Sequence, residues 1–415
     1  MVRVRFAPSP TGIPHMGNTR TALYNYLWAR HNQGNFILRI EDTDQKRFVK
    51  GSEAKILEIL QFLGLIWDEG PYRQSDRLEL YQQYARELVD KGVAYEAEGA
   101  IRLRVPPGRD IVWEDLIQGK MTIKTQGMNE PVLLKSDGWP TYHLAVVVDD
   151  HLMEISHILR AAEWISSTPK HLLIYEALGW TPPQIGHFSV ILGPDKAKLS
   201  KRHGAKSILD YRDEGYLPTA LLTFMAYLGW SYEDNSKVLT LEELTQRFDL
   251  KQVHKANPIF DQKKLDYFNA LLIRQMNQTE LAAALQPFVP ADCPQELVVK
   301  IVPLIQERLV RLGEFENLTE WFYREVKPDP KIMVKEQLEE SIKVIEGLGK
   351  WENEAMEASF RQVAEEKGWK PGQFFMMLRV ALTGRTVTPP LFATMEVLGK
   401  QVVLDRLAHA QNTIA

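Results

Sequence analysis

The first 44 residues constrain the fold most, because they read as a strand, a glycine-containing loop, a helix and a second strand in immediate succession. Val2, Val4 and Phe6 alternate with arginines, which is the period-2 pattern of a strand with one buried face. Residues 7–18 then hold three prolines and two glycines, which exclude both a helix and a sheet ladder. The chain therefore passes directly from a strand into a shaped loop.

A helix and a second strand follow this loop. Helical spacing of apolar residues predicts a helix that begins at Asn18 or Thr19 and ends where residues 32–35 break the pattern. Residues 36–40 alternate again and lead into the acidic segment 41–44. This order predicts a parallel strand pair, and ligands of such sheets bind outside the carboxyl ends of the strands. The loop and the acidic segment both fall at those ends, which is the first indication of a functional site.

The loop carries a histidine and a glycine of interest. A loop that enters a helix N-terminus offers unpaired N–H groups and the positive end of the helix dipole, which suit a phosphate. Neither the glycine-rich P-loop nor the dinucleotide-binding glycine fingerprint occurs here. Instead His15 stands two residues before Gly17, so that a donor imidazole lies beside a position where a flat ring or a phosphate can approach the backbone. Taken alone, the pair fits an ordinary turn equally well.

Length and composition set the broad class of the protein. The 415 residues are enough for roughly two to four domains. No run approaches the ~18 apolar residues of a membrane span, and Met1 leads into a strand rather than a signal segment, so a cytoplasmic protein is expected. The single cysteine, Cys293, excludes an internal disulfide and a cysteine-based zinc site. Because the net charge is only -4, any nucleic-acid surface must be a local basic patch.

The middle of the chain contains further strand candidates and a dense cationic loop. Residues 155–159 and 189–192 are the expected strands, with a helix from Thr168 to Gly179 between them. The loop at residues 193–206 follows directly and contains six basic side chains but only one acid. Its composition fits a solvated charged loop and a mobile cationic loop over polyphosphate equally well.

Two other regions complete the organisation. Residues 95–135 form short strand-like pieces with scattered basic residues, which usually mark a solvated face. After residue 206 helical patterns dominate to the end of the chain. An all-helical tail after an α/β head indicates an appended recognition module.

Several motifs carry a family resemblance. The tetrapeptide HMGN at residues 15–18 resembles the HIGH motif of class I aminoacyl-tRNA synthetases, and KLSKR at residues 198–202 resembles their KMSKS loop. Together with RFAPSPTG at 5–12, RIEDTD at 39–44 and RAAEW at 160–164, they are similar to the bacterial-type glutamyl-tRNA synthetases. The similarity continues near the end of the chain in LRVALTGR (378–385) and TPPLF (388–392).

The resemblance implies a fold and a domain order. The expected fold is α/β, with a Rossmann-like class I synthetase catalytic domain that holds a small inserted subdomain and is followed by all-α stem-contact and anticodon-binding domains. The expected domains are 1–94 (first half of the catalytic domain), 95–135 (shortened acceptor-arm insertion), 136–205 (second half), 206–278 (stem-contact) and 279–415 (anticodon-binding).

The resemblance also implies a reaction: ATP converts glutamate to glutamyl adenylate, and the glutamyl group is transferred to the 2′-OH of the terminal adenosine of tRNA(Glu). The residues expected to bind the amino acid are Arg5, Ala7, Ser9, Glu41, Tyr142 and Arg160. Those expected at ATP or in catalysis are His15, Gly17, Asn18, Glu163, Trp164, Lys198, Ser200 and Lys201. The positions matching anticodon contacts are Arg379, Thr388, Pro389 and Leu391, although Pro389 and Leu391 also fit a packed turn.

The chain departs from the family pattern in two places. Between Tyr95 and Ala100, family members carry a helical segment, sometimes with a cysteine-based zinc site, of which only residues 96–99 remain here. Zinc is therefore not expected, and acceptor-stem contacts are in doubt; Mg²⁺ is expected with ATP, without a cluster of protein ligands. The KMSKS-like loop has Leu199 and Arg202 at two variable positions but keeps both lysines and the serine, so little loss is expected.

The sequence leaves several alternatives open. One is an enzyme that also glutamylates tRNA(Gln), because a single sequence does not reveal which third anticodon base is tolerated. A short paralogue that modifies a base of aspartate tRNA lacks the helical anticodon domain and fits less well. A non-catalytic tRNA-binding protein would not need His15, Gly17, Lys198 and Lys201. The resemblance makes a monomer the default.

Overall fold

The computed structural model describes residues 1–199, 206–233 and 235–414, which fall into two compact units. The N-terminal unit comprises Met1–Asp213 with Leu217–Phe268, and the C-terminal unit comprises Glu214–Tyr216 with Asn269–Ala415. Among the described residues, no helix has the length and apolar character needed to cross a membrane.

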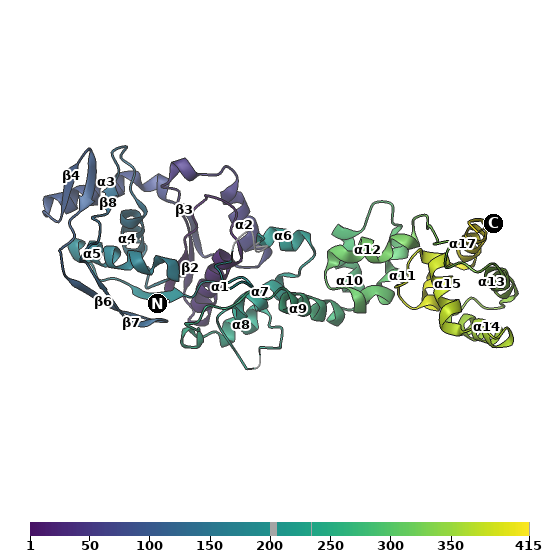
Figure 1. Ribbon diagram of the computed structural model, residues 1–415. Helices are drawn as coiled ribbons and strands as arrows, with labels where there is room; N and C mark the ends of the chain where they lie inside the picture. The colour runs from purple at the N-terminus through teal and green to yellow at the C-terminus, as the bar shows by residue number, and fades with distance from the viewer. Residues whose placement is uncertain (200–205, 234, 415) are drawn as a thin grey trace. The chain divides into compact units, whose positions relative to one another are not determined.

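The N-terminal unit begins with the predicted parallel pair, which is confirmed. Strands β1 (Arg3–Phe6), β2 (Asn35–Ile40) and β3 (Glu69–Arg73) form one sheet in that order. β1 and β2 run parallel, and helix α1 (Met16–His31) connects them. Helix α2 (Ser52–Phe62) lies between β2 and β3 in the chain (Figure 1). The loop after β1 and the acidic end of β2 therefore lie at the same edge of the sheet.

The prediction of one polar face on β1 is wrong. Val4, Arg5 and Phe6 are all buried, so β1 has no solvent-facing side over these residues. Arg5 is only 4% exposed and is held by Asp150 of helix α4 (Tyr142–Leu152). An arginine in the alternating position thus points into a buried ion pair instead of water.

A second sheet lies beside the first. Its order is β7 (Gly119–Lys124), β6 (Asp110–Asp115), β10 (Gln184–Phe188) and β9 (His157–Ala161). The backbone N–H of Ser156 donates to the carbonyl of Arg3 over 2.9 Å, which places the start of β9 next to β1. Strands β9 and β10 are parallel, and Arg160, near the end of β9, lines the same cavity as Arg5 and Phe6 at the end of β1.

The strand expected at residues 189–192 lies earlier in the chain, as β10. The polar His187 and the small Gly186 interrupt the apolar pattern of this strand, which hid it from periodicity. The absence of a side chain at Gly186 suits the packing, since a β-carbon there would come within 2.9 Å of Leu159 Cδ2 on β9 and the leucine would have to shift. Residues 189–192 instead follow the strand and lead into the cationic loop.

The third sheet is antiparallel and small. Strands β4 (Ala94–Ala97), β5 (Ala100–Leu103) and β8 (Val132–Leu134) form it. β4 and β5 are joined by a two-residue turn in which Glu98 has φ 54° and Gly99 has φ 76°. Positive φ at both positions is the signature of a type I′ hairpin turn, which matches the twist of the flanking strands. Helices α3 (Leu78–Asp90), α4 and α5 (Thr168–Leu178) share one hydrophobic core with this sheet.

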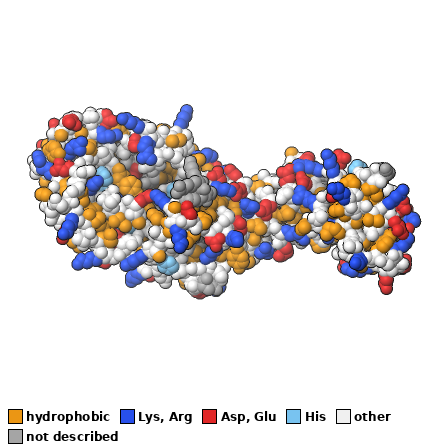
Figure 2. Space-filling model, viewed as in Figure 1, with side chains coloured by type: hydrophobic (Ala, Val, Ile, Leu, Met, Phe, Trp, Pro, Cys, Tyr) orange, Lys and Arg blue, Asp and Glu red, His pale blue; other side chains and the backbone are white. Residues whose placement is uncertain are grey.

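The remaining elements that the structure describes are helical. The helices from residue 208 to 275 are α6 (Ile208–Asp213), α7 (Pro218–Tyr227), α8 (Leu241–Arg247) and α9 (Gln262–Gln275). The C-terminal unit then contains α10 (Gln278–Leu285), α11 (Gln295–Ile305), α12 (Phe315–Thr319), α13 (Lys335–Gly347), α14 (Asn353–Glu366), α15 (Pro371–Thr383), α16 (Leu391–Leu398) and α17 (Lys400–Asn412). The visible face of the molecule mixes acidic and basic side chains (Figure 2), in keeping with the small net charge.

Candidate active site

A cavity of ≈ 440 Å³ lies in the N-terminal unit where β1, β2 and β9 end. Many of the predicted site residues line it: Arg5, Ala7, Ser9, His15, Asn18, Glu41, Tyr142, Arg160, Glu163 and Trp164. Gly17 and Lys198 line a smaller hollow of ≈ 40 Å³ that shares His15, Asn18 and Glu163 with the cavity. Ser200 and Lys201 lie outside the described residues. Residues from five separate stretches of the sequence, 5–18, 41, 142, 160–164 and 198, are thus brought together.

His15 caps helix α1, which begins earlier than predicted. The helix begins at Met16, not at Asn18 or Thr19, because the His15 side chain acts as its N-cap. The backbone N–H of Gly17 donates to His15 Nδ1 over 3.1 Å, so the ring proton resides on Nε2 and is available as a donor. A β-carbon on Gly17 would lie 3.1 Å from the ring carbon Cε1, so glycine lets the ring fold back onto the helix end.

The charge state of His15 follows from its surroundings. Partial burial and the nearby Lys198 ammonium lower the pKa of His15 below its ordinary value, while Glu163 opposes the shift. The imidazole is therefore neutral at neutral pH. Lys198 forms an ion pair with Glu163, and both side chains are substantially exposed at 59% and 43%. A cation, a neutral ring donor and the positive end of a helix dipole meet at one place, which suits a phosphate group.

Below the part of the cavity that Arg5 and Glu41 line is a buried ionic network. Arg5 donates from Nε and Nη2 to the two carboxylate oxygens of Asp150 over 2.9 and 3.1 Å. Arg39 donates to Asp150 over 2.8 Å and to Glu41 over 2.9 Å. Burial alone would raise the pKa of Asp150, but Arg5 and Arg39 outweigh burial and hold it below its ordinary value. These two arginines and two carboxylates balance one another in charge.

Glu41 is the carboxylate of this network that faces the cavity. Burial raises the pKa of Glu41, although Arg39 and Arg5 oppose the increase. Its position beside the cavity gives an incoming ammonium group a partner that is already oriented by Arg39.

Arg160 is a buried cation of a different kind. All of its neighbours that accept hydrogen bonds are neutral: His187, His171, Thr168, Tyr142 and the carbonyl of Trp164. Among the described residues, no carboxylate forms an ion pair with it, whereas Arg5, the other arginine that lines the cavity, is paired with Asp150. The cavity therefore holds one excess positive charge at Arg160, in the position where an anionic ligand would neutralise it.

Comparison with known proteins agrees with this geometry. The sequence matches the family described as tRNA synthetases class I (E and Q), catalytic domain, over residues 1–100 and 96–267, and an anticodon binding domain over residues 280–411. The chain belongs to the class I aminoacyl-tRNA synthetases of this family. It is therefore an aminoacyl-tRNA ligase, and the predicted fold class is confirmed.

Individual relatives of the synthetase are similar over its whole length. A protein named glutamate–tRNA ligase from Dehalococcoides mccartyi (strain ATCC BAA-2100) is 43% identical, covering 99% of this chain and 97% of its own. One of the same name from Herpetosiphon aurantiacus is 39% identical, covering 98% and 97%. The crystal structure of a glutamate tRNA ligase from Elizabethkingia meningosepticum in complex with its amino acid matches with a TM-score of 0.90 and 33% identity over 100% of both chains.

The comparisons also locate residues that this synthetase lacks. The alignment with the Dehalococcoides relative extends over 471 positions, although this chain has only 415 residues. The family match is broken into two pieces that overlap at residues 96–100. The two-residue turn at Glu98 and Gly99 lies within this stretch. The chain therefore closes a shortened insertion with the tightest ordinary hairpin connection.

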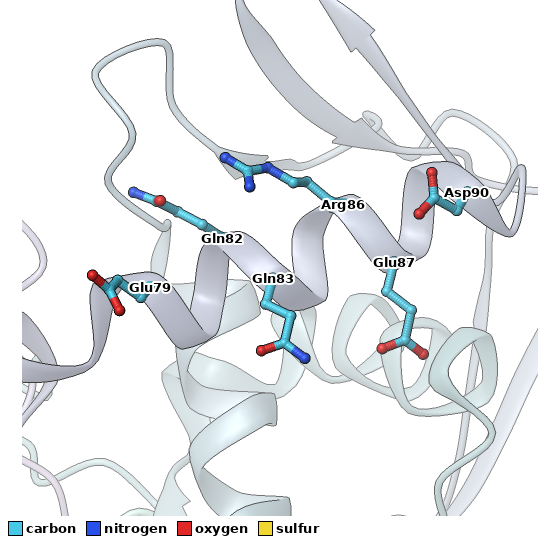
Figure 3. A pocket seen from close by; sticks show the side chains of 6 residues that line it. All are labelled: Glu79, Gln82, Gln83, Arg86, Glu87 and Asp90. Atoms are coloured by element: carbon cyan, nitrogen blue, oxygen red, sulfur yellow. The ribbon is translucent and has the colours of Figure 1, made fainter.

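The synthetase contains a larger hollow that is not a site. This space of ≈ 560 Å³ is lined by Glu79, Gln82, Gln83, Arg86, Glu87 and Asp90, all from helix α3. Figure 3 shows these side chains extending to both sides of the helix rather than toward a common point. A binding site needs an apolar wall and converging polar groups, and a single polar helix face supplies neither.

The positions expected at the anticodon lie together in the C-terminal unit. Arg379 of α15 donates to the carbonyl of Pro389 over 2.7 Å and to both oxygens of Thr388. Thr388 and Leu391 are each only 5% exposed, and Pro389 is buried as well. Their packing favours the turn interpretation for Pro389 and Leu391. Beside them Val387 is 73% exposed and lines a hollow of ≈ 380 Å³ with Arg385.

The sequence missed the residues behind the cavity wall. Asp150 and Arg39 hold Arg5 and Glu41, while His171 and His187 hold Arg160. The doublet of acids that closes the apolar run 144–148 was a usable signal, since adjacent carboxylates after buried residues need partners. Neither histidine stood in a recognisable pattern. Among the described residues, no group of three potential ligands could hold a metal ion.

Proposed function

We propose that this synthetase is a glutamate–tRNA ligase that forms glutamyl adenylate from glutamate and ATP. It then transfers the glutamyl group to the 2′-OH of the terminal adenosine of tRNA(Glu), with release of AMP and pyrophosphate. The observation that carries the proposal is the single unbalanced charge of the cavity, at Arg160. Free glutamate carries one ammonium and two carboxylates, so its net charge of −1 complements that excess, whereas uncharged glutamine would leave it unpaired.

The amino acid has partners for each of its charged groups. Glu41 would bind the ammonium, and Arg5 and Arg160 would bind the two carboxylates. Arg5 commits Nε and Nη2 to Asp150 but lines the cavity, which keeps Nη1 for the ligand. Ala7, Ser9 and Tyr142 would shape the pocket and supply hydrogen bonds. The relatives named glutamate–tRNA ligase, one of them solved with its amino acid, support the same substrate.

ATP would occupy the adjoining end of the site. The nucleoside would lie near Glu163 and Trp164, and the phosphates near His15, Gly17 and Asn18. The α-carboxylate of glutamate attacks the α-phosphorus while pyrophosphate leaves, and no protein nucleophile is required. His15 Nε2–H and the Lys198 ammonium would stabilise the charge that develops on the phosphate oxygens. Lys201 and Ser200 would act in the same loop.

Magnesium is expected to accompany ATP. The described residues offer no cluster of carboxylates for the ion, so it would be held chiefly by phosphate oxygens and water. The single cysteine, Cys293, excludes only a zinc site built from several cysteines.

The tRNA would be recognised by two separate regions of the chain. The shortened β4–β5 hairpin lies in the region expected to meet the acceptor arm, and the C-terminal helices in the region expected to meet the anticodon. Arg379 is our candidate for anticodon contact, together with Arg385 and the exposed Val387, and the buried Thr388, Pro389 and Leu391 would hold the turn that presents them. We further propose a monomeric, cytoplasmic enzyme, in line with the family resemblance.

The decisive experiment is charging of purified tRNA(Glu), tRNA(Gln) and tRNA(Asp) with labelled glutamate and ATP. Pyrophosphate exchange is measured in parallel, with and without tRNA. Charging of tRNA(Glu) is expected, and the tRNA(Gln) reaction decides how discriminating the enzyme is. Exchange without charging would place a defect in delivery of the acceptor end and indicate the shortened hairpin. Absence of both activities would contradict the proposal and favour a non-catalytic tRNA-binding protein.

A further inference from the structure

The guanidinium of Arg160 has an inner and an outer set of hydrogen bonds. On the inner side, Nε donates to His187 Nε2 over 3.1 Å, Nη1 to His171 Nδ1 over 3.1 Å and Nη2 to the Thr168 hydroxyl over 2.9 Å. None of these three acceptors lines the cavity. They form a buried layer behind the wall, because Thr168, His171 and His187 are each at most 3% exposed.

The outer set faces the cavity. Nη1 also donates to the Tyr142 hydroxyl over 3.2 Å, and Nη2 to the Trp164 carbonyl over 3.4 Å. Tyr142 and Trp164 both line the cavity, and these are the two longest bonds of Arg160. One N–H from each terminal nitrogen is therefore directed to the ligand side. Two parallel donors of this kind match the two oxygens of a carboxylate.

The inner bond to His187 requires one particular tautomer. Since Arg160 can only donate, His187 Nε2 must be unprotonated, and the ring proton must reside on Nδ1. Nδ1 lies 2.5 Å from Asp115 Oδ2, which accepts that proton's hydrogen bond. The other oxygen, Asp115 Oδ1, accepts from the backbone N–H groups of Ile117, Gln118 and His187 over 3.1, 2.9 and 3.1 Å. The carboxylate is thus fixed between β6 and β10.

We propose that Asp115 and His187 are positioning residues for glutamate: Asp115 fixes the His187 tautomer, and His187 aligns the Arg160 fork with the substrate carboxylate. The inference rests on the proposed role of Arg160 in binding glutamate. His171 supports the other side of the same guanidinium by the same logic. Its Nδ1 accepts from Arg160, and its Nε2 faces His143 Nδ1 at 3.1 Å.

Neutral hydrogen-bond acceptors are better suited to hold Arg160 for substrate binding than a carboxylate would be. A carboxylate directly on Arg160 would neutralise the cation and compete with the substrate for its donors. Here the carboxylate of the buried layer, Asp115, lies one imidazole ring away from Arg160. Burial lowers the pKa of His187 and of His171 below the ordinary value, so both rings remain neutral at neutral pH although Asp115 opposes the shift of His187. Arg160 is therefore held firmly while its charge stays available.

Asp115→Asn tests this chain of contacts from Asp115 through His187 to Arg160, which we call the relay, with minimal change of side-chain shape. The amide oxygen can keep the three backbone bonds of Oδ1, whereas a flipped amide would direct its NH₂ at three N–H donors. The amide nitrogen then donates to His187 Nδ1, which moves the ring proton to Nε2, directly against Arg160 Nε–H. We expect the glutamate KM in pyrophosphate exchange with tRNA(Glu) to rise about 10- to 100-fold, with the ATP KM and the fold unchanged.

The spectroscopic signature is the His187 tautomer itself. In the full chain labelled with ¹⁵N-histidine, nitrogen shifts should report Nδ1–H in the wild type and Nε2–H in Asp115→Asn. Asp110→Asn, at the exposed far end of the same strand, is the matched control and should change neither the tautomer nor the KM.

A second pair of variants covers the case in which Asp115→Asn does not fold. His187→Gln keeps an acceptor for Arg160 without any tautomer, whereas His187→Leu removes the acceptor. The glutamate KM should stay within about threefold of wild type in His187→Gln and rise in His187→Leu. In the His187→Gln background, the additional change Asp115→Asn should have little effect, because the coupling has been removed.

The outcomes separate the inference from the function on which it rests. If Arg160→Lys leaves the glutamate KM unchanged, the proposed role of Arg160 fails, and the relay fails with it. If Arg160→Lys raises the KM but His187→Leu and Asp115→Asn do not, or the tautomer changes without any change in KM, then Arg160 binds glutamate and the relay alone is overturned. A rise in KM together with the tautomer change supports it.

Discussion

Arg5 on β1 and Asp150 on α4 form a buried two-point ion pair although they are 145 residues apart in the chain. Both side chains are at most 4% exposed. Asp150 also accepts from Arg39, which in turn holds Glu41. The floor of the cavity is therefore a single ionic unit that joins the first strand to the helix after the insertion.

We predict that Asp150→Asn destabilises the N-terminal unit by about 3–5 kcal/mol, because it leaves the buried guanidinium of Arg5 without a carboxylate partner. Urea unfolding followed by tryptophan fluorescence measures the loss. Glu53→Gln is the matched control, since it removes the carboxylate of the more exposed Arg73 pair and should cost less than about 1 kcal/mol. Equal losses in both variants would contradict the structural role of the buried pair.

Arg160→Lys should raise the glutamate KM by about 10- to 100-fold and leave the ATP KM nearly unchanged. Lysine keeps the charge but loses the two parallel donors, and a charge-assisted hydrogen bond contributes about 1.5–3 kcal/mol. Steady-state pyrophosphate exchange in the presence of tRNA(Glu) gives both constants. Arg109→Lys, whose side chain forms an exposed pair with Glu176, is the control and should behave as wild type. A variant that loses only stability would make Arg160 structural.

The β1–α1–β2 unit was predictable because strand and helix periodicities are local properties of the sequence. The same reasoning failed where a distant partner decides the outcome. Alternation placed Arg5 in water, whereas Asp150, far away in the chain, draws it inside. The start of α1 was placed too late because histidine is not a usual N-cap residue, and only the folded-back ring shows that His15 serves as one.

The family motifs supplied residues that meet around the cavity, but not the layer behind them. His187 and His171 act on Arg160 from separate elements, β10 and α5, and a pattern within one element contains no trace of such a meeting. Strand β10 was itself misplaced, because Gly186 and His187 interrupt its apolar run for reasons of packing and hydrogen bonding. The residues that line the cavity lie in short sequence motifs, so the sequence reveals them. The residues that hold these side chains in place come from distant parts of the chain, so only the tertiary structure reveals them.

His15→Asn and His15→Ala should separate the two roles of His15. Asparagine is a good N-cap, so His15→Asn should keep helix α1 stable, while His15→Ala should cost about 1 kcal/mol. Both variants lose the Nε2–H donor and should lower the rate of pyrophosphate exchange by about 10²-fold or more. Chemical denaturation and exchange kinetics on the same samples make the comparison. If His15→Asn exchanged pyrophosphate at the wild-type rate, helix capping alone would account for the role of His15.

Lys198→Ala should lower the rate of adenylate formation by about 10²–10³-fold with little effect on tRNA binding. The Lys198 ammonium forms an ion pair with Glu163, so a contact with phosphate oxygens would compete with this pair. Glu163→Gln should consequently alter ATP affinity without abolishing the reaction. Lys196→Ala is the control, because Lys196 is an exposed lysine of the same loop. A similar loss of rate in this variant would show that the overall charge of the loop matters, and not Lys198 in particular.

As the pH is lowered, the free energy of unfolding should begin to fall at a higher pH than protonation of the carboxylates alone would cause. Burial lowers the pKa of His143 from 6.5 to about 4, and Lys170 and Arg160 add to the effect. A histidine with a lowered pKa in the folded state binds its proton in the unfolded state first, so its stabilising contribution is complete above pH 6.5 and is lost as the pH falls toward 4. Asp150, whose pKa is lowered, loses its contribution only below about its ordinary value of 3.8.

Urea unfolding at a series of pH values from 7.5 to 4 tests this dependence, at about half-unit steps. His143→Phe should flatten the fall of the unfolding free energy between pH 6.5 and 4 relative to wild type, because the variant no longer binds the extra proton when it unfolds. His409→Gln, on the exposed side of α17, controls for the loss of a histidine elsewhere. Curves of the same shape for His143→Phe and wild type would show that the half-buried His143 ring does not titrate with folding. A flattened curve would identify His143, which faces His171 behind the cavity, as an acid-sensitive group of the N-terminal unit.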